Sequence, residues 1–182
     1  MLVRQGYWPL IGAIAGLVIT NAIAIGKIAL QARQSFAAQL ALKRVEFMSE
    51  QLSDFYNPLF SLLAANRHVF ENFGPATFPT DQGRRDAAAM NWKAMRDAVI
   101  LPNNESISRI LRDKSHLISD TDDIAKYLDL NNHVHAYRVF VKEPTEAYAK
   151  HAFPKAVAGH LETKRAELLF RLTSLKSLGD IS

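Results

Sequence analysis

The chain has no cysteine, which excludes disulfides, thiolate metal sites and cysteine nucleophiles. Only 8 of its 182 residues are glycine, and none of them forms a glycine-rich phosphate-binding loop. An HExxH zinc motif is absent, and no serine lies in a nucleophile-elbow pattern. The net charge of +4 comes without a clustered basic face, which argues against nucleic-acid binding. These absences predict no cofactor and no metal, and they favour a non-enzymatic protein.

One stretch near the start, residues 7–25, contains no charged residue. A helix needs about 20 apolar residues to cross the hydrocarbon core of a bilayer, so this stretch is long enough to span it. A cleaved signal peptide is the alternative, because Ala22-Ile23-Ala24 offers a small-x-small cleavage pattern. The apolar character continues past that point through Ile28 and Leu30. We therefore expect a retained transmembrane signal anchor over residues 1–27.

Lysine and arginine are distributed unevenly around this span. Arg4 precedes it, whereas Lys27, Arg33, Lys43 and Arg44 follow within about 20 residues, the range over which the bias is counted. Because cytoplasmic flanks carry the excess of positive charge, we expect a single-pass protein whose C-terminal domain lies in the cytoplasm.

Gly12 and Gly16 form a GxxxG motif inside the span. Small residues at this spacing let two membrane helices approach closely, so the motif predicts packing between two copies of the chain. Glycine is also common in membrane helices that do not pair, which is the alternative interpretation. The expected partners are thus the lipid bilayer and either a second copy or another protein.

The region after the span has helical periodicity. Between Phe36 and Phe73, apolar residues recur in steps of three to five, which fits one face of a helix and not strand alternation. We expect a stalk helix over residues 28–57 that continues from the span and enters a domain. Pro58 predicts a kink or break near Asn57, because proline lacks a backbone donor and clashes with the preceding turn.

The remaining chain, residues 58–182, reads as a soluble helical bundle of about five helices. Gly74-Pro75 predicts a helix end, and Leu101-Pro102-Asn103-Asn104 predicts a break between two further helices. No segment has the pattern of a strand. The predicted fold class is therefore all-α, with an N-terminal transmembrane helix continuing into a stalk helix and then the bundle.

Candidate binding residues gather on the helix expected over residues 122–142. Asn131, His135 and Arg138 share one stripe, because they are four and three residues apart. His116 belongs to the preceding helix, and antiparallel packing would bring it near His135. The favoured interpretation of the cluster is a hydrogen-bonded polar seam between two helices or a partner contact. The alternative is a small anion or metal site built from His116, His135 and Arg138, although an arginine argues against a cation.

Two other polar groups have simpler explanations. Asn66 and Arg67 lie on the long helix, either as part of a binding surface or as ordinary helix surface. Asp122 and Asp123 are adjacent, so their side chains diverge by about 100° on a helix. That arrangement suits helix capping better than a shared acid–base role.

Three blocks of sequence, LSDFYNPLFSLLAANRHVF, LPNNESISRILRDKSHLI and HVHAYRVF, carry a family resemblance. They are similar to blocks of uncharacterised bacterial proteins that pair an N-terminal membrane helix with a soluble helical domain. The resemblance covers residues 51–140 and the layout of the anchor. It implies a bacterial inner-membrane setting and one domain, and it supplies no activity.

The expected function is a membrane-anchored protein-interaction or scaffold module at the inner face of a bacterial membrane. A small-molecule sensor that signals through the stalk helix is the second possibility, with Pro58 as its hinge. A membrane-associated enzyme that uses His116 and His135 as acid and base is the third, and it lacks a carboxylate or nucleophile placed by a motif.

The predicted orientation has a direct test. Fusing alkaline phosphatase and a fluorescent protein separately to the C-terminus should give low phosphatase activity and bright fluorescence, because the domain is expected in the cytoplasm. A strongly active phosphatase fusion with a dark fluorescent fusion would place the domain on the other side of the membrane.

Overall fold

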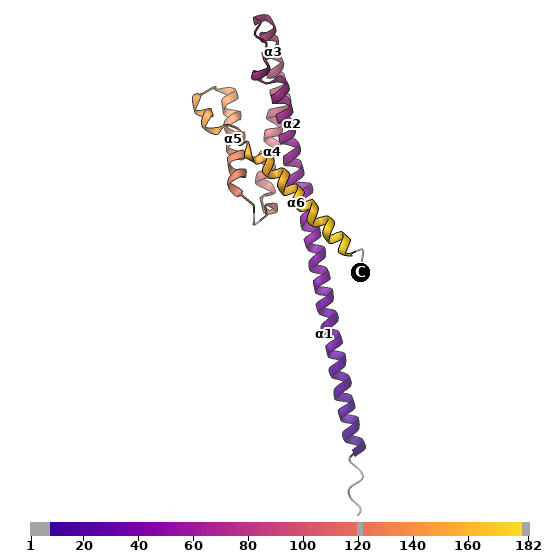
Figure 1. Ribbon diagram of the computed structural model, residues 1–182. Helices are drawn as coiled ribbons and strands as arrows, with labels where there is room; N and C mark the ends of the chain where they lie inside the picture. Colours follow the sequence, from indigo (N-terminus) through magenta and orange to yellow (C-terminus); the bar gives the residue numbers. More distant parts are fainter. Residues whose placement is uncertain (1–7, 120–121, 180–182) are drawn as a thin grey trace, which may run out of the picture. The chain divides into compact units, whose positions relative to one another are not determined.

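The computed structural model describes residues 8–119 and 122–179 (Figure 1). Within these residues every regular element is a helix and none is a strand, so the prediction of an all-helical chain is confirmed. The helical residues form four uninterrupted runs in the described part of the chain, over 8–73, 82–113, 124–142 and 156–179. The chain divides into two compact units, Met1–Val45 and Glu46–Ser182, and the division falls inside the first run.

The first unit consists of the greater part of α1 (Trp8–Glu50). Every described side chain from Gly12 to Arg44 is exposed, including Ile14, Leu17 and Val18. A helix that is apolar on all sides is found in the core of a large protein or in a membrane. This helix is long and apolar enough to cross a bilayer.

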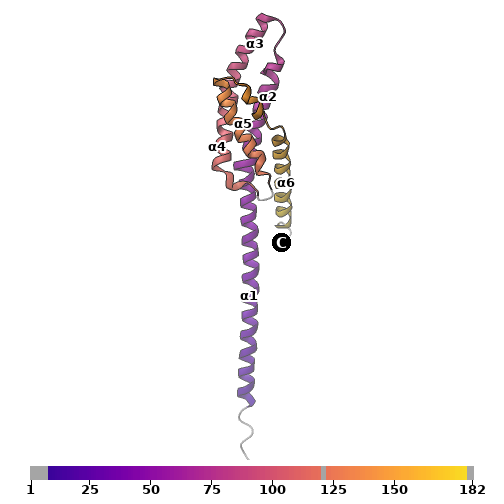
Figure 2. The same ribbon diagram turned by 90° about the vertical axis from the view of Figure 1, so that its left-hand side faces the viewer.

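The second unit contains the remaining helices, which appear in Figure 2. They are α2 (Asn57–Phe73), α3 (Gln82–Met95), α4 (Leu101–Asp113), α5 (Ile124–Lys142) and α6 (Ala156–Gly179). Two π-helical segments, Gln51–Tyr56 and Arg96–Ile100, join α1 to α2 and α3 to α4. Short 3₁₀ turns lie in the connections at Pro75–Thr77, Ser115–Leu117 and Glu146–His151.

Both π-helical segments directly precede a proline-containing first turn. The backbone N–H of Asn57 bonds to the Leu52 carbonyl, one residue further back than in an α-helix. A wider turn relieves the clash between a proline ring and the carbonyl four residues earlier. The chain therefore continues through Pro58 without a break. The break predicted at Leu101–Asn104 is wrong for the same reason, because the Leu101 N–H bonds to the Arg96 carbonyl in front of Pro102.

The core of the second unit lies around the first turns of α2. Fully enclosed side chains come from the π-helical segment Gln51–Tyr56 and from α2, α4, α5 and α6. They are Phe55, Tyr56, Leu59, Ile107, Leu130, Val157 and Leu161, with Leu117 from the loop after α4. α4 and α6 both pack against α2, and α5 packs against α4 and α6. Of the apolar stripe expected from the sequence, Leu52, Phe55, Leu59 and Val69 are buried, whereas Phe36, Leu40 and, at the far end, Phe73 are exposed.

The Gly74-Pro75 pair ends α2 as predicted, and the structure requires glycine there. The N–H of Gly74 donates to the Phe70 carbonyl oxygen at 2.9 Å. A Cβ built on Gly74 would overlap that same oxygen. Any side chain at this position must therefore displace the end of α2.

We expect Gly74→Ala to lower the free energy of unfolding by about 1–3 kcal/mol, the usual cost of forcing an extra methyl group into occupied space. Thermal melting of the full chain in detergent, followed by circular dichroism, measures the change. Gly83→Ala is the matched control, because its Cβ meets only Asp81 Oδ1 at 3.8 Å. Equal melting temperatures for the two variants would contradict the close approach.

Candidate functional site

α4 and α5 run antiparallel and pack against each other (Figure 2). Their polar contact lies near the middle of both helices. Ser108 Oγ on α4 donates to Asn131 Oδ1 at 3.1 Å and lies 3.2 Å from His135 Nε2. The single hydroxyl proton is directed to Asn131 Oδ1, so Ser108 links two side chains of α5 in a hydrogen-bonded polar contact between the helices.

A cavity of about 700 Å³ opens beside this contact, and we call it the α4–α5 groove. Its lining residues are Leu101, Asn104, Glu105, Ser108, Arg109, Arg112, Val134, His135, Arg138, Val139 and Lys142. Four of these side chains are cationic and one is anionic. The volume lies in the range of ligand-binding clefts, about 300–1,000 Å³.

The charges of the groove are not balanced within the domain. Arg112 pairs with its neighbour Asp113 at 2.7 Å, on the exposed surface. Arg109, Arg138 and Lys142 form no ion pair with any residue that the structure describes. All three are exposed, so their charges are available to a ligand.

Of the predicted cluster, the structure brings Asn131, His135 and Arg138 to the same side of α5. Asn131 and His135 share Ser108, and His135 and Arg138 line the α4–α5 groove. His116 is separate: it is exposed in the 3₁₀ turn Ser115–Leu117 and does not line the groove. Sequence reasoning missed Ser108, because nothing distinguishes it from Ser106, the other serine of α4, until the helices are placed.

Asn66 and Arg67 have different surroundings. Asn66 Nδ2 donates to Asn104 Oδ1 at 2.9 Å, and Asn103 Nδ2 donates to Asn66 Oδ1 at 2.8 Å. These amides join α2 to α4, and Asn104 reaches the α4–α5 groove. Arg67 pairs with Glu71 at 2.8 Å on the open surface, a contact of small energetic weight.

A second polar cluster, the Asp122 network, was missed by the sequence analysis. The Asp122 side chain is fully enclosed, and its Oδ2 accepts from the hydroxyls of Tyr56 at 2.6 Å and Tyr127 at 2.8 Å. Its Oδ1 accepts from the Asp123 N–H at 2.9 Å and contacts His160 Nε2. Partners from the π-helical segment before α2, from α5 and from α6 thus meet at one carboxylate.

Opposing effects set the ionisation of the Asp122 network. Burial raises the pKa of Asp122, but hydrogen bonds from Tyr56, Tyr127 and His160 together outweigh burial and lower the pKa below its usual value. Burial raises the pKa of both tyrosines, and the Asp122 carboxylate raises it further. At neutral pH the network therefore contains one carboxylate and two neutral phenols.

The residue His133, which points away from the α4–α5 groove, lies in an aromatic cluster. Its ring lies 6.0 Å from those of Tyr137 and Tyr148 and 5.4 Å from that of Phe153, between ring centroids. Its Nδ1 lies 2.7 Å from the carbonyl oxygen of His151. Burial lowers the pKa of His133 and raises that of Tyr148 to about 12, so both are neutral at physiological pH. The cluster holds the segment after α5 against that helix.

Among the described residues, no group of three or more histidine, aspartate or glutamate side chains is arranged to hold a metal ion. Comparison with protein-family models, with curated proteins and with solved structures gives no match for this chain. The function must therefore be argued from the geometry alone.

The Asp122 network predicts a pH-dependent stability. The pKa of Asp122 is lower in the folded state, so its contribution is present above its unfolded value, about 3.9, and is lost as the pH falls through the folded value. We expect Asp122→Ala to cost about 3–5 kcal/mol at pH 7, as for other broken buried pairs, and progressively less as the pH falls below the unfolded value.

Thermal melting of the wild type and of Asp122→Ala between pH 3 and pH 8 measures this difference. Asp123→Ala is the matched control, because Asp123 is exposed and, within the described residues, its ion pair is with Lys126. A constant difference between wild type and Asp122→Ala across the pH range would show that the carboxylate charge does not stabilise the fold.

Proposed function

We propose that the protein is a single-pass, non-enzymatic interaction or scaffold module, anchored by α1 at the inner face of a bacterial membrane. The observation that carries this proposal is the α4–α5 groove, whose exposed cations Arg109, Arg138 and Lys142 form no ion pair with the described residues. Unbalanced surface charges at a cleft give specificity and speed to the encounter with a partner of opposite charge.

The anchor is supported by the exposure of α1. Exposed side chains on every side of the helix between Gly12 and Ile25 are uncharged and mostly apolar, and a lipid environment would bury them all. Anchoring confines the domain to a surface and raises its effective concentration there. A cleaved signal sequence would have the same composition, and the mass of the natural protein distinguishes the two.

The contact surface that we propose includes His135 and Arg138 on α5, with Asn66 and Arg67 on α2 and His116 in the loop after α4. Of these, Arg67, His116, His135 and Arg138 are exposed. An enzyme that uses His116 and His135 together is disfavoured, because only His135 of these two lines the groove. The Nε2 atom of His135 is also hydrogen-bonded to Ser108.

A small-molecule sensor is the second candidate, and the π-helical segments favour it. π-Helical turns inside α-helices are frequent at functional sites and at bends. Both segments precede a proline, and both lead into residues of the domain interior, such as Tyr56 and Asn104. A ligand that raises the melting temperature of the chain would support this reading.

The leading proposal predicts a stoichiometric partner after cross-linking in native membranes and affinity purification. We expect His135→Ala/Arg138→Ala to lower the recovered partner by about fivefold or more, since a few central residues dominate most interfaces. Lys93→Ala is the control. Lys93 lies exposed on α3, and its ion pair in the described structure is with Asp97 in the π-helical segment that follows. Recovery of the chain alone would instead indicate a homo-oligomer, which Gly12→Leu/Gly16→Leu should then disrupt.

A further inference from the structure

The groove cations, Arg109, Arg112, Arg138 and Lys142, are spaced regularly along the α4–α5 groove. Ser108 contacts Asn131 and His135 on the facing helix, and of these two only His135 lines the groove with it, so Ser108 and His135 mark one level of the two antiparallel helices. Counting in opposite directions from that pair places Arg138 level with Glu105 and Lys142 level with Leu101. The lining of the groove agrees with these two pairings, because it contains both Glu105 and Arg138 and both Leu101 and Lys142.

Successive groove cations are therefore three or four residues apart along the groove. At 1.5 Å per residue that is a backbone rise of about 4.5–6 Å between neighbours and about 16.5 Å in total. A single small anion draws its donors to one point, whereas the backbone positions of these four are distributed along the length of the groove. Their rise is comparable to the pitch of an α-helix, about 5.4 Å, so side chains one turn apart on a bound helix would reach successive groove cations.

The floor of the groove is apolar. Val134 is buried at its base, and Val139 is 58% exposed toward it. An apolar floor beneath a row of cations fits an amphipathic helix with acidic residues along one edge, in the helix-in-groove mode of recognition. Among the described lining residues Glu105 alone is anionic. Its charge would repel a ligand helix that carried acidic residues along both edges.

We propose that the α4–α5 groove binds an acidic amphipathic helix of a partner protein, with carboxylates one turn apart against the groove cations and an apolar face on Val134 and Val139. The inference rests on the proposed function, because it names the chemistry of the partner that the module binds. Arg109, Arg138 and Lys142 can each take a carboxylate without breaking an ion pair of the described domain.

The test uses the full chain in phosphatidylcholine nanodiscs and two fluorescent helical peptides of about 18 residues and equal composition. One peptide has glutamates at i, i+4, i+7 and i+11 beside a leucine face, and the other has them distributed around the helix. Fluorescence anisotropy should show about tenfold or tighter binding of the first peptide, with an affinity that falls as salt increases.

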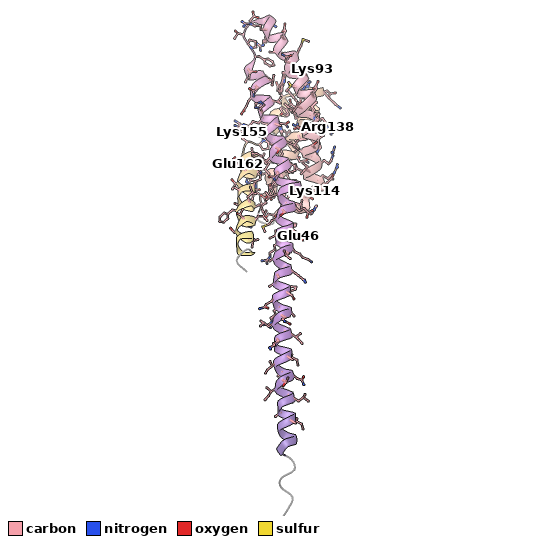
Figure 3. All side chains as sticks on the ribbon, turned by 90° about the vertical axis from the view of Figure 1, so that its right-hand side faces the viewer. Glu46, Lys93, Lys114, Arg138, Lys155 and Glu162 are labelled. Carbon is pink, nitrogen blue, oxygen red and sulfur yellow. The ribbon has the colours of Figure 1, made fainter. Side chains whose placement is uncertain are left out.

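A charge-reversal pair assigns the binding to the groove. Arg138→Glu/Lys142→Glu should weaken the first peptide about tenfold or more, because two attractions become repulsions. The control Arg85→Glu/Lys155→Glu makes the same charge change at exposed residues with no ion pair in the described structure. Figure 3 shows Lys155 and Arg138 on opposite sides of the domain. The melting temperature of each variant verifies folding.

Several results would overturn the inference. Equal binding of the two peptides, or an equal loss of binding in the control variant, would show that the groove does not recognise the patterned helix. Binding of inorganic tripolyphosphate in the absence of peptide binding would make the cavity a small-anion site. Loss of peptide binding when phosphatidylglycerol is added to the nanodiscs would make the membrane surface the occupant.

Failure here is distinguishable from failure of the proposed function. If cross-linking recovers the same partner in equal amount with Arg138→Glu/Lys142→Glu, the module binds through another surface and only the groove inference fails. If the wild type recovers no partner while the patterned peptide binds the groove, the proposed cellular function fails and the chemistry of the groove stands.

Discussion

Asp122 accepts hydrogen bonds from side chains that lie 66 residues before it and 38 residues after it in the chain. Burying a carboxylate costs several kcal/mol unless strong donors replace water. Here two phenols, an imidazole and a backbone N–H supply that replacement. The segment before α2, the start of α5 and the first turns of α6 are therefore fixed to one another at a single point.

The π-helical segment Gln51–Tyr56 makes this arrangement possible. Its wide turn carries the chain past Pro58 and places Tyr56 in the interior, where the hydroxyl reaches Asp122. The next residue, Asn57, accepts from Arg165 Nε at 2.7 Å, and that guanidinium lies 4.1 Å above the ring of Phe60. Pro58 would break an ordinary α-helix, but after the π-helical turn it lies beside the point where α2 contacts α6.

The α4–α5 groove differs from this interior in its chemistry. In the Asp122 network every donor has an acceptor, which suits a structural role. In the groove, cationic side chains from both helices (Arg109, Arg138 and Lys142) form no ion pair within the described domain. Unsatisfied charge at a cleft is stable only because water solvates it, and a ligand can replace that water. The structural site and the candidate binding site are thus separate.

The sequence by itself determined the helical class, the long apolar helix and the end of α2 at Gly74. These follow from local properties, namely apolar periodicity, span length and the steric limits of glycine and proline. It also placed Asn131, His135 and Arg138 on one stripe of α5, because spacing along a single helix is local information.

Only the tertiary structure decided how helices meet. In the structure the partner of His135 is Ser108 and not His116, as the sequence had suggested. The helix also continues through Leu101–Asn104 by means of a π-helical turn. The tertiary structure also turned Asp122 from an expected capping residue into the acceptor for Tyr56 and His160. These contacts join residues tens of positions apart, and the free energy that selects them comes from packing and burial, which a local pattern does not encode.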